Sequence, residues 1–239
     1  MTQNPLILAV ETSGRLGSVA IALGEKMLGQ TIFTGPMRHS TEILPAVGEL
    51  LDKLTQRPNQ IKQIYISAGP GSFTGLRIGV TIAQIMNLAN DAKIVTVDTL
   101  DCIAANATEF MGQDKADSHK IATILDAKRG QFFVAVYQRD CPHLLKIVPD
   151  CLMTAEGFVG RFARGSAPVW LLGEGLLYHK DKFKADGIEF LDESYWQPKA
   201  SKVHMLGWQK ALNNRFADPL TVQPAYLRKP ETKEKPQNL

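Results

Sequence analysis

A glycine-rich turn at residues 69–75 is the strongest candidate for a site of chemistry in this sequence. It follows an apolar run at 64–67, predicted to be a buried strand, and precedes an apolar stretch at 76–89, predicted to be a helix. Such a turn directs backbone N–H groups and the positive end of the helix dipole at an anion. The residues that could contact a nucleotide or phosphate there are Gly69, Gly71, Ser72 and Thr74.

The same turn also has a purely structural interpretation. Its glycines allow a tight turn, Pro70 stiffens it, and Ser72 or Thr74 would cap the helix. It has neither the Gly-Lys-Ser/Thr of a P-loop nor a Gly-x-Gly-x-x-Gly fingerprint. The spacing alone therefore supports anion binding and a structural turn about equally.

A carboxylate and two hydroxyls follow the first apolar run, at 6–10. Glu11 and Ser13 could face a phosphate or a metal from the end of a central strand. The local sequence favours the alternative, in which Glu11 is a solvated turn residue and Thr12 and Ser13 bond to nearby backbone. His39 has only Glu42 at ligand spacing, so we expect it to hydrogen-bond at the start of a helix rather than act as a ligand or base.

Composition limits the class of protein. The 239 residues are 44% hydrophobic and 21% charged, as in an ordinary soluble globular protein, and a net charge of +3 is too small to indicate nucleic-acid binding by itself. The three cysteines lack metal spacing and cannot all pair, which favours a reducing compartment. We find no signal peptide and no membrane span, so we expect a cytoplasmic protein without a membrane contact.

The remaining chain predicts an α/β fold in two units. Strands are predicted at 6–10, 18–23, 27–33, 64–67, 93–97, 121–125, 132–137, 144–148, 169–172 and 188–191. Helices are predicted at 40–54, 75–89, from 98 or 99, 156–164, 176–185 and 201–214. A polar stretch at 112–119 is predicted to link the units, 221–228 to be extended, and the tail at 229–239 to be disordered.

The helix after the glycine turn is apolar on all sides. A surface helix has one apolar stripe, so this one is expected to be covered on more than one side. Either a second layer of this chain covers it, as in a core helix, or a partner does.

Five motifs, in this order, resemble the TsaB family, formerly called YeaZ. They are residues 10–13 (Val-Glu-Thr-Ser), 39–45 with His-Ser and Leu-Pro, 69–79 (Gly-Pro-Gly-Ser-Phe-Thr-Gly-Leu-Arg-Ile-Gly), 126–130 (Asp-Ala-Lys-Arg-Gly) and 224–228 (Pro-Ala-Tyr-Leu-Arg). The third is highly specific and the others are weak alone. The sequence departs from many relatives at Glu11, Lys128 and Gln131, which puts inherited phosphate or hairpin contacts in doubt.

The resemblance implies an actin-like, sugar-kinase-like (ribonuclease H-like) fold of two related lobes, each a mixed sheet flanked by helices. We expect an N-terminal lobe at 1–110, joined by a helix at about 201–216, and a C-terminal lobe at 111–200.

The resemblance further implies a non-catalytic subunit. It would bind and support TsaD, which transfers threonylcarbamoyl to the adenosine beside the anticodon of tRNA, together with the ATPase TsaE. This chain would meet tRNA through the complex and form a homodimer without TsaD. It would have no cofactor of its own, although ATP or ADP could bind at the interface with TsaD.

Two enzymatic alternatives are weaker. A metallopeptidase would need the His-x-x-x-His metal ligands of TsaD-type chains, but Thr99 and Ile103 occupy that register, so we expect no metal site. A small-molecule kinase or ATPase would need glycine loops in the second lobe, where Gly173-Glu-Gly175 is the only faint candidate.

The family pairs through helices of its N-terminal lobe, which here correspond to 40–54 and 75–89. From the resemblance and the apolar pattern we predict a contribution to core and partner surfaces from Leu44, Val47, Leu51, Ile78, Ile82 and Met86.

Overall fold

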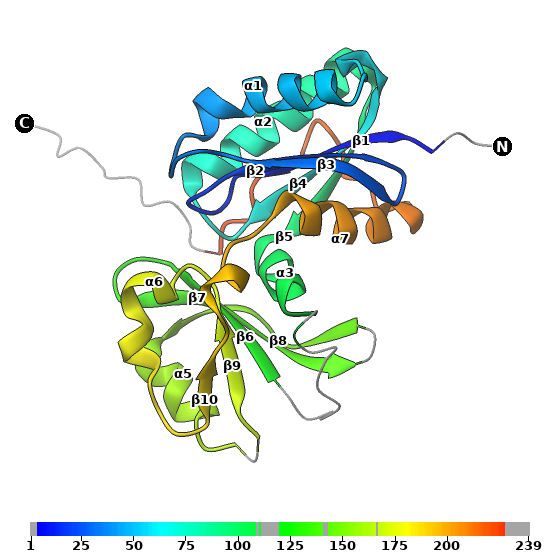
Figure 1. Ribbon diagram of the computed structural model, residues 1–239. Coiled ribbons are helices and arrows are strands. Elements are labelled where there is room, and N and C mark those ends of the chain that lie inside the picture. The colour runs from blue at the N-terminus through cyan, green and yellow to red at the C-terminus, as the bar shows by residue number, and fades with distance from the viewer. Residues whose placement is uncertain (1–3, 109, 111–119, 141–142, 166, 228–239) are drawn as a thin grey trace, which may run out of the picture.

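The chain folds into two lobes, each built on a five-stranded mixed sheet with flanking helices (Figure 1). The computed structural model describes residues 4–108, 110, 120–140, 143–165 and 167–227. The predicted α/β fold with two mixed sheets is confirmed. The predicted linker at 112–119 and the tail at 229–239 lie outside the described residues.

The first sheet has the strand order β3-β2-β1-β4-β5. Its strands are β1 (Leu6–Glu11), β2 (Ser18–Leu23), β3 (Lys26–Ile32), β4 (Ile61–Gly69) and β5 (Lys93–Asp98). The first three form an antiparallel meander, and β4 and β5 run parallel to β1. Every residue of β1 is buried, which explains its continuous apolar run, because a central strand is covered on both faces.

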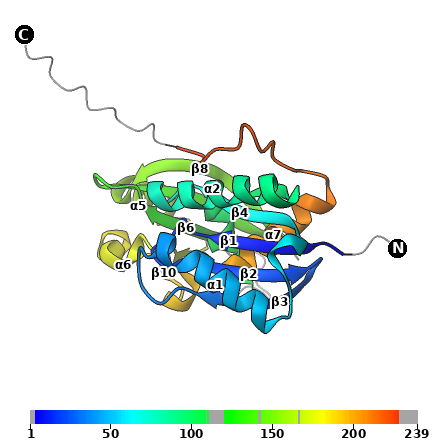
Figure 2. The ribbon, with the colours of Figure 1, turned by 90° about the horizontal axis from the view of Figure 1, so that it is seen from above.

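Helices cover both faces of this sheet. Helices α1 (His39–Lys53) and α2 (Phe73–Asn90) share one core with it, and α7 (Ala200–Leu212) shares a second core on the other side (Figures 1 and 2). A short 3₁₀ helix, η1 (Pro58–Gln60), precedes β4. Among the described residues, no helix is both long and apolar enough to cross a membrane.

The second sheet repeats the topology of the first. Its strands are β6 (Lys120–Asp126), β7 (Gln131–Asp140), β8 (His143–Thr154), β9 (Val169–Leu172) and β10 (Ile188–Phe190), in the order β10-β9-β6-β7-β8. Again the first three strands form an antiparallel meander, and the last two are parallel to the first. The two lobes therefore share one plan, as expected of related lobes, although the sequence shows no repeat.

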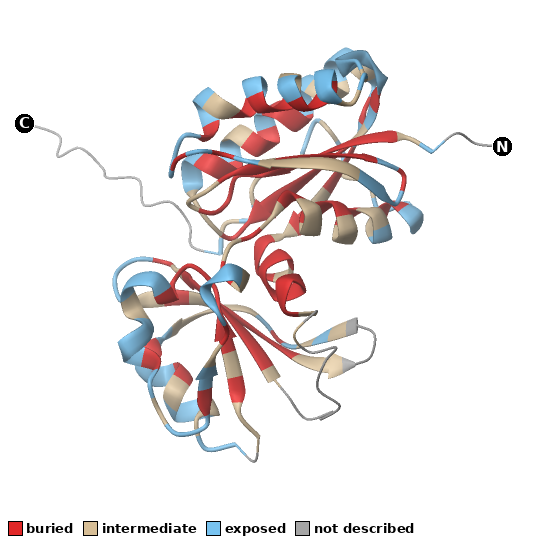
Figure 3. Cartoon of the chain, viewed as in Figure 1, coloured by how far each residue is buried: buried red, intermediate tan, exposed pale blue. Residues whose placement is uncertain are grey.

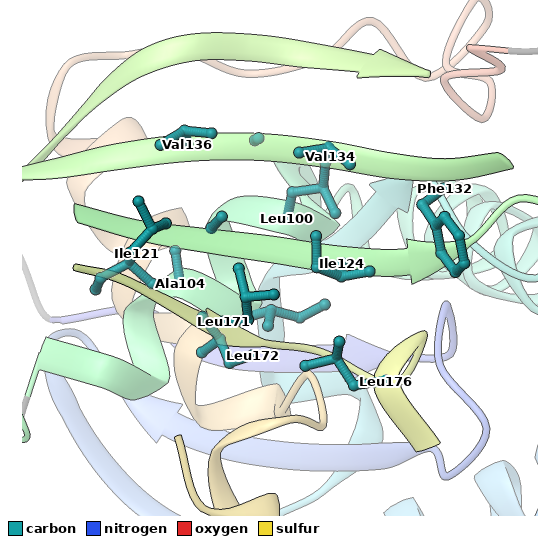
Figure 4. Packing of buried hydrophobic residues seen from close by; sticks show 14 of the residues in the cluster. Leu100, Ala104, Ile121, Ile124, Phe132, Val134, Val136, Leu171, Leu172 and Leu176 are labelled. Atoms are coloured by element: carbon teal, nitrogen blue, oxygen red, sulfur yellow. The ribbon is translucent and has the colours of Figure 1, made fainter. Parts of the chain in front are cut away.

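Short helices flank the second sheet. They are α5 (Ala155–Phe162), α6 (Leu176–His179), η3 (Lys180–Phe183) and η4 (Glu193–Tyr195). The single helix predicted at 176–185 is thus an α-helical turn followed by a 3₁₀ turn. In the core of this lobe, Ile121 and Ile124 of β6 pack with Val134 of β7 and Leu171 of β9 (Figure 4).

Helix α3 (Thr99–Ala104), continued by η2 (Ala105–Ala107), lies between the two lobes (Figure 1). Asp98 caps it, because its Oδ1 accepts hydrogen bonds from the N–H groups of Leu100 (2.8 Å) and Asp101 (3.4 Å). The side chains of Leu100 and Ile103 are buried in the core of the second lobe.

Helix α7 already packs on the first sheet, and the segment after it stays with the first lobe without forming a strand. The N–H of Ala217 donates to Ile94 O (2.8 Å), and that of Ala225 donates to Ala68 O (2.7 Å). Ala217 thus contacts the start of β5, and the described part of the segment predicted to be extended (221–228) contacts the end of β4 through Ala225.

Candidate functional site

The glycine turn joins β4 to α2 as the sequence predicts. A cis peptide bond links Gly69 to Pro70, and Ser72 is the N-cap of α2, its Oγ accepting from the N–H of Gly75 (3.3 Å). Thr74 lies inside the first helical turn instead. Of the two predicted caps, Ser72 is confirmed.

The backbone of the turn after β1 lies directly against the glycine turn. The N–H of Ser72 donates to Ser13 O (2.8 Å), and Thr12 Oγ1 donates to Gly75 O (2.8 Å). A Cβ added to Gly71 would lie 2.6 Å from Ser13 O, and one added to Gly75 would lie 1.8 Å from Thr12 O. Both positions are therefore glycine because backbone occupies the space of a side chain, which favours the structural interpretation of the turn.

Glu11 is fully buried, so the expectation of a solvated turn residue is wrong. Its Oε1 accepts hydrogen bonds from Ser13 N (2.5 Å), Ser13 Oγ (2.5 Å) and Gly14 N (3.3 Å). Burial raises the pKa of Glu11 against the effect of these bonds. The predicted local hydrogen bonding is confirmed for Ser13, whereas Thr12 bonds across to the glycine turn.

His39 is the first residue of α1 and lies buried, with Nε2 3.0 Å from Gly14 O. Burial lowers the pKa of His39, so the ring is neutral and Nε2–H donates to this carbonyl. The predicted hydrogen bond at a helix start is confirmed.

A cleft of about 450 Å³ separates the two lobes at the glycine turn. Ser13, Gly71 and Ser72 line it from the first lobe, and Asp126, Glu174 and Tyr178 are among the residues that line it from the second. Sequence reasoning considered the Gly-Glu-Gly stretch only as a faint glycine loop and missed Glu174. This carboxylate is 8% exposed, and its Oε2 accepts from the N–H of Arg15 (2.8 Å).

The residues in the metal-ligand register do not fit a metal. Thr99 is buried, and Ile103 packs in the core of the second lobe. Asp101 Oδ1 is engaged by Lys146 Nζ (2.7 Å) and by the hydroxyl of Tyr137 (2.9 Å). Across the described ranges, no group of three or more His, Cys, Asp and Glu side chains is arranged to hold a metal.

Comparison with known proteins assigns the chain to a family. Residues 36–234 match the family described as TsaD, tRNA N6-adenosine threonylcarbamoyltransferase. The tRNA threonylcarbamoyladenosine biosynthesis protein TsaB of Bacillus subtilis is 30% identical over 233 residues, which is 96% of each chain. The chain belongs to the TsaB family.

Other TsaB proteins agree with this assignment. The protein from Escherichia coli is 26% identical over 93% of this chain and 94% of its own. The structure of YeaZ from Pseudomonas aeruginosa superposes with a TM-score of 0.78, at 23% identity, over 93% of this chain and all of that one. The TsaB-type fold expected from the motifs is thereby confirmed.

In this TsaB-family chain, the six residues predicted to contact a partner differ in solvent exposure. Leu44 is 62% exposed, whereas Val47, Leu51 and Ile82 are buried in the core under α1 and α2. Ile78 and Met86 are half-buried. Contact of any of them with a partner stays a prediction, but only the accessible ones can provide much partner surface.

Between α1 and α2 lies a groove of about 360 Å³. Its lining residues are Ser40, Ile43, Leu44, Phe73, Thr74, Arg77, Ile78, Thr81 and Ile82. Further along α2, Ile85 is 53% and Leu88 88% exposed, and sequence reasoning did not single these two out as partner contacts. The outward sides of both helices are exposed while the sides toward the sheet are buried (Figure 3). Helix α2 thus packs on the sheet with one side and also contacts the segment after α7, where Gln84 donates to Pro219 O (3.3 Å) and Arg77 to the Tyr226 hydroxyl (3.4 Å). Ile85 and Leu88 remain exposed.

Proposed function

We propose that this chain is a non-catalytic subunit of tRNA threonylcarbamoyladenosine biosynthesis that binds and supports TsaD through α1 and α2. The observation that carries the proposal is the apolar groove between these helices, continued by Ile85 and Leu88 on the exposed side of α2. Contiguous exposed apolar surface on a soluble protein marks a site for a partner.

The family supplies the identity of the partners. TsaB and TsaD belong to one pathway by name, and the match of this chain to the TsaD family supports a complex of two similar subunits. TsaE joins this complex, tRNA is reached through it, and the same groove forms a homodimer when TsaD is absent. The chain has no cofactor of its own, and ATP or ADP binds at the interface with TsaD.

The first test is reconstitution. Cognate TsaD and TsaE, tRNA and threonylcarbamoyl-AMP are combined with and without this chain, and modified adenosine is measured. We expect modified adenosine only when this chain is present. The chain alone should neither modify tRNA nor turn over ATP. Activity of the isolated chain would overturn the non-catalytic role.

The second test is a charge in the groove. Leu44→Asp should weaken binding to TsaD by about 2–4 kcal/mol, because a buried anchor at an interface contributes this much. Ile82→Asp is unsuitable, since Ile82 lies in the core. The matched control is Leu212→Asp, a helical leucine of equal exposure on α7 (63% against 62%). Equal affinity of both variants, measured by titration calorimetry, would place the interface elsewhere.

A further inference from the structure

One hydrogen bond crosses the cleft between a backbone amide and a buried carboxylate. The N–H of Arg15, in the turn after β1, donates to Oε2 of Glu174, in the turn between β9 and α6 (2.8 Å). The Arg15 guanidinium also lies 5.3 Å from the centre of the Tyr178 ring. A Cβ added to neighbouring Gly14 would come within 3.1 Å of the same carboxylate oxygen. The lobes are thus in close contact at Glu174.

The surroundings of the Glu174 carboxylate disfavour its charged form. Glu174 is only 8% exposed, and among the described residues its Oε1 finds no hydrogen-bond partner. The carboxylate of Glu11 is also buried, and it accepts hydrogen bonds from the amides of Ser13 and Gly14 in the turn that contains Arg15. A buried charge without full hydrogen bonding is costly. Burial, together with the charge of Glu11, raises the pKa of Glu174 to about 7 against the bond from Arg15.

The other charged or titratable groups near the cleft differ from Glu174. They are Glu11, Arg15 and His39 of the first lobe, and Asp126, Lys128, Tyr178 and His179 of the second. Asp126 is paired with Lys128 (2.7 Å), which lowers the pKa of Asp126 although burial opposes it. His39 is neutral because burial lowers its pKa. Glu11 makes no bond to the second lobe among those its carboxylate forms.

We propose that Glu174 is a proton-operated latch between the two lobes. When protonated, its side chain stays in the cleft and holds the amide of Arg15. When ionised, it moves into water, where its charge is solvated, and the cleft opens. The latch acts within this chain and does not depend on the proposed role with TsaD.

Linkage gives the direction and the pH range. The closed state has the raised pKa, and the open, solvated state has an ordinary carboxyl pKa. Opening therefore releases a proton and becomes more favourable as pH rises from the ordinary carboxyl range to about 7. Above that range both states are ionised and the opening equilibrium levels off.

Hydrogen exchange of the Arg15 amide reports the latch directly, because this N–H is the donor. In the full chain, the protection factor, corrected for intrinsic exchange, should fall by up to about tenfold per pH unit between about pH 5 and 7, then level off. In Glu174→Gln, whose amide is neutral at every pH and can still accept through oxygen, protection should not vary with pH. His179→Gln should keep the wild-type slope, since it removes an imidazole next to Asp126 (4.0 Å) and leaves Glu174 in place.

A flat wild-type profile, an unchanged slope in Glu174→Gln, or loss of the slope in His179→Gln would each overturn the proposal. The wild-type protein gives a second measurement that needs no variant. A carbon-13 NMR titration of the Glu174 carboxyl group should show a midpoint near 7, and a midpoint in the ordinary carboxyl range would also overturn it.

Discussion

At the residue scale, the glycine turn is determined by backbone that comes from elsewhere in the chain. Gly71 and Gly75 lie against the carbonyls of Ser13 and Thr12, some 60 residues earlier in sequence. The hydrogen bonds between the two turns fix the first strand against the start of α2. The shape of this turn does not require a bound phosphate, because the neighbouring main chain alone excludes larger residues.

Gly75→Ala tests this packing. The added Cβ would meet Thr12 O at 1.8 Å, so the turns must move apart and the Thr12 bond must weaken. We expect a loss of about 3 kcal/mol or more in the free energy of unfolding, measured with urea.

Gly48→Ala is the matched control, because it lies inside α1 with no atom within 4 Å of its added Cβ. This substitution should raise the free energy of unfolding by up to about 1 kcal/mol, because alanine has a higher helix propensity than glycine. Equal effects of the two substitutions would show that the turns do not constrain Gly75.

At the element scale, an ionic network attaches the start of α3 to the second sheet. Lys146 of β8 lies 2.7 Å from Asp101 of α3, 2.7 Å from Asp150 and 3.4 Å from Asp98. The Tyr137 hydroxyl of β7 donates to Asp101 as well. One ammonium thus lies within ion-pair distance of three carboxyl groups, more than its single charge can neutralise. Burial, then a hydrogen bond with Asp150, raises the pKa of Asp98 to about 7.

Lys146→Met should therefore destabilise the protein by about 2 kcal/mol at neutral pH, since it leaves three partly buried carboxylates without their cation. Because the pKa of Asp98 is raised to about 7 in the folded state, the protein loses stability as the pH rises through this range. The loss caused by Lys146→Met should therefore be larger at about pH 8 than at about pH 5. Thermal unfolding across this range measures it.

Lys62→Met is the matched control. Lys62 is an exposed lysine of the first lobe, and in the described structure its Nζ bonds only to a backbone carbonyl (3.4 Å). Its removal should change the free energy of unfolding little. Adding Asp150→Asn to Lys146→Met should restore part of the stability. A loss that is independent of pH would contradict the electrostatic explanation.

At the scale of the whole molecule, α3 connects the two cores. Leu100, Ile103 and Ala104 belong to the core of the second lobe, while Cys102 of the same helix belongs to the core under α7 in the first lobe. Neither lobe can lose its core without disturbing this helix, so the lobes are expected to be energetically coupled.

We expect a single calorimetric unfolding transition for the full chain, despite its two sheets. Gly75→Ala, in the first lobe, should lower the temperature at which second-lobe amides such as those of β6 lose protection. Two separate transitions, or second-lobe amides insensitive to this substitution, would show that the lobes unfold independently.

Features that depend on neighbouring residues could be predicted from the amino-acid pattern. The apolar runs and the cap at Ser72 follow from side chains and backbone close in sequence, whereas the acceptor of the His39 bond, Gly14 O, lies 25 residues earlier in the chain. The motif at the glycine turn also identified the family correctly, since its residue types are constrained by the fold. This is why nearly all strands and helices could be predicted.

The accessibility of individual side chains could not be predicted in this way, because it depends on long-range packing. Glu11 is fully buried at the end of β1, and Glu174 contacts Arg15 from 159 residues away. Leu44 and Leu51 share one helix and one residue type, yet one is 62% and the other 1% exposed. The burial of a side chain depends on elements from distant parts of the chain that pack against it. A local sequence pattern does not show which of these elements will cover a given face of a helix or strand.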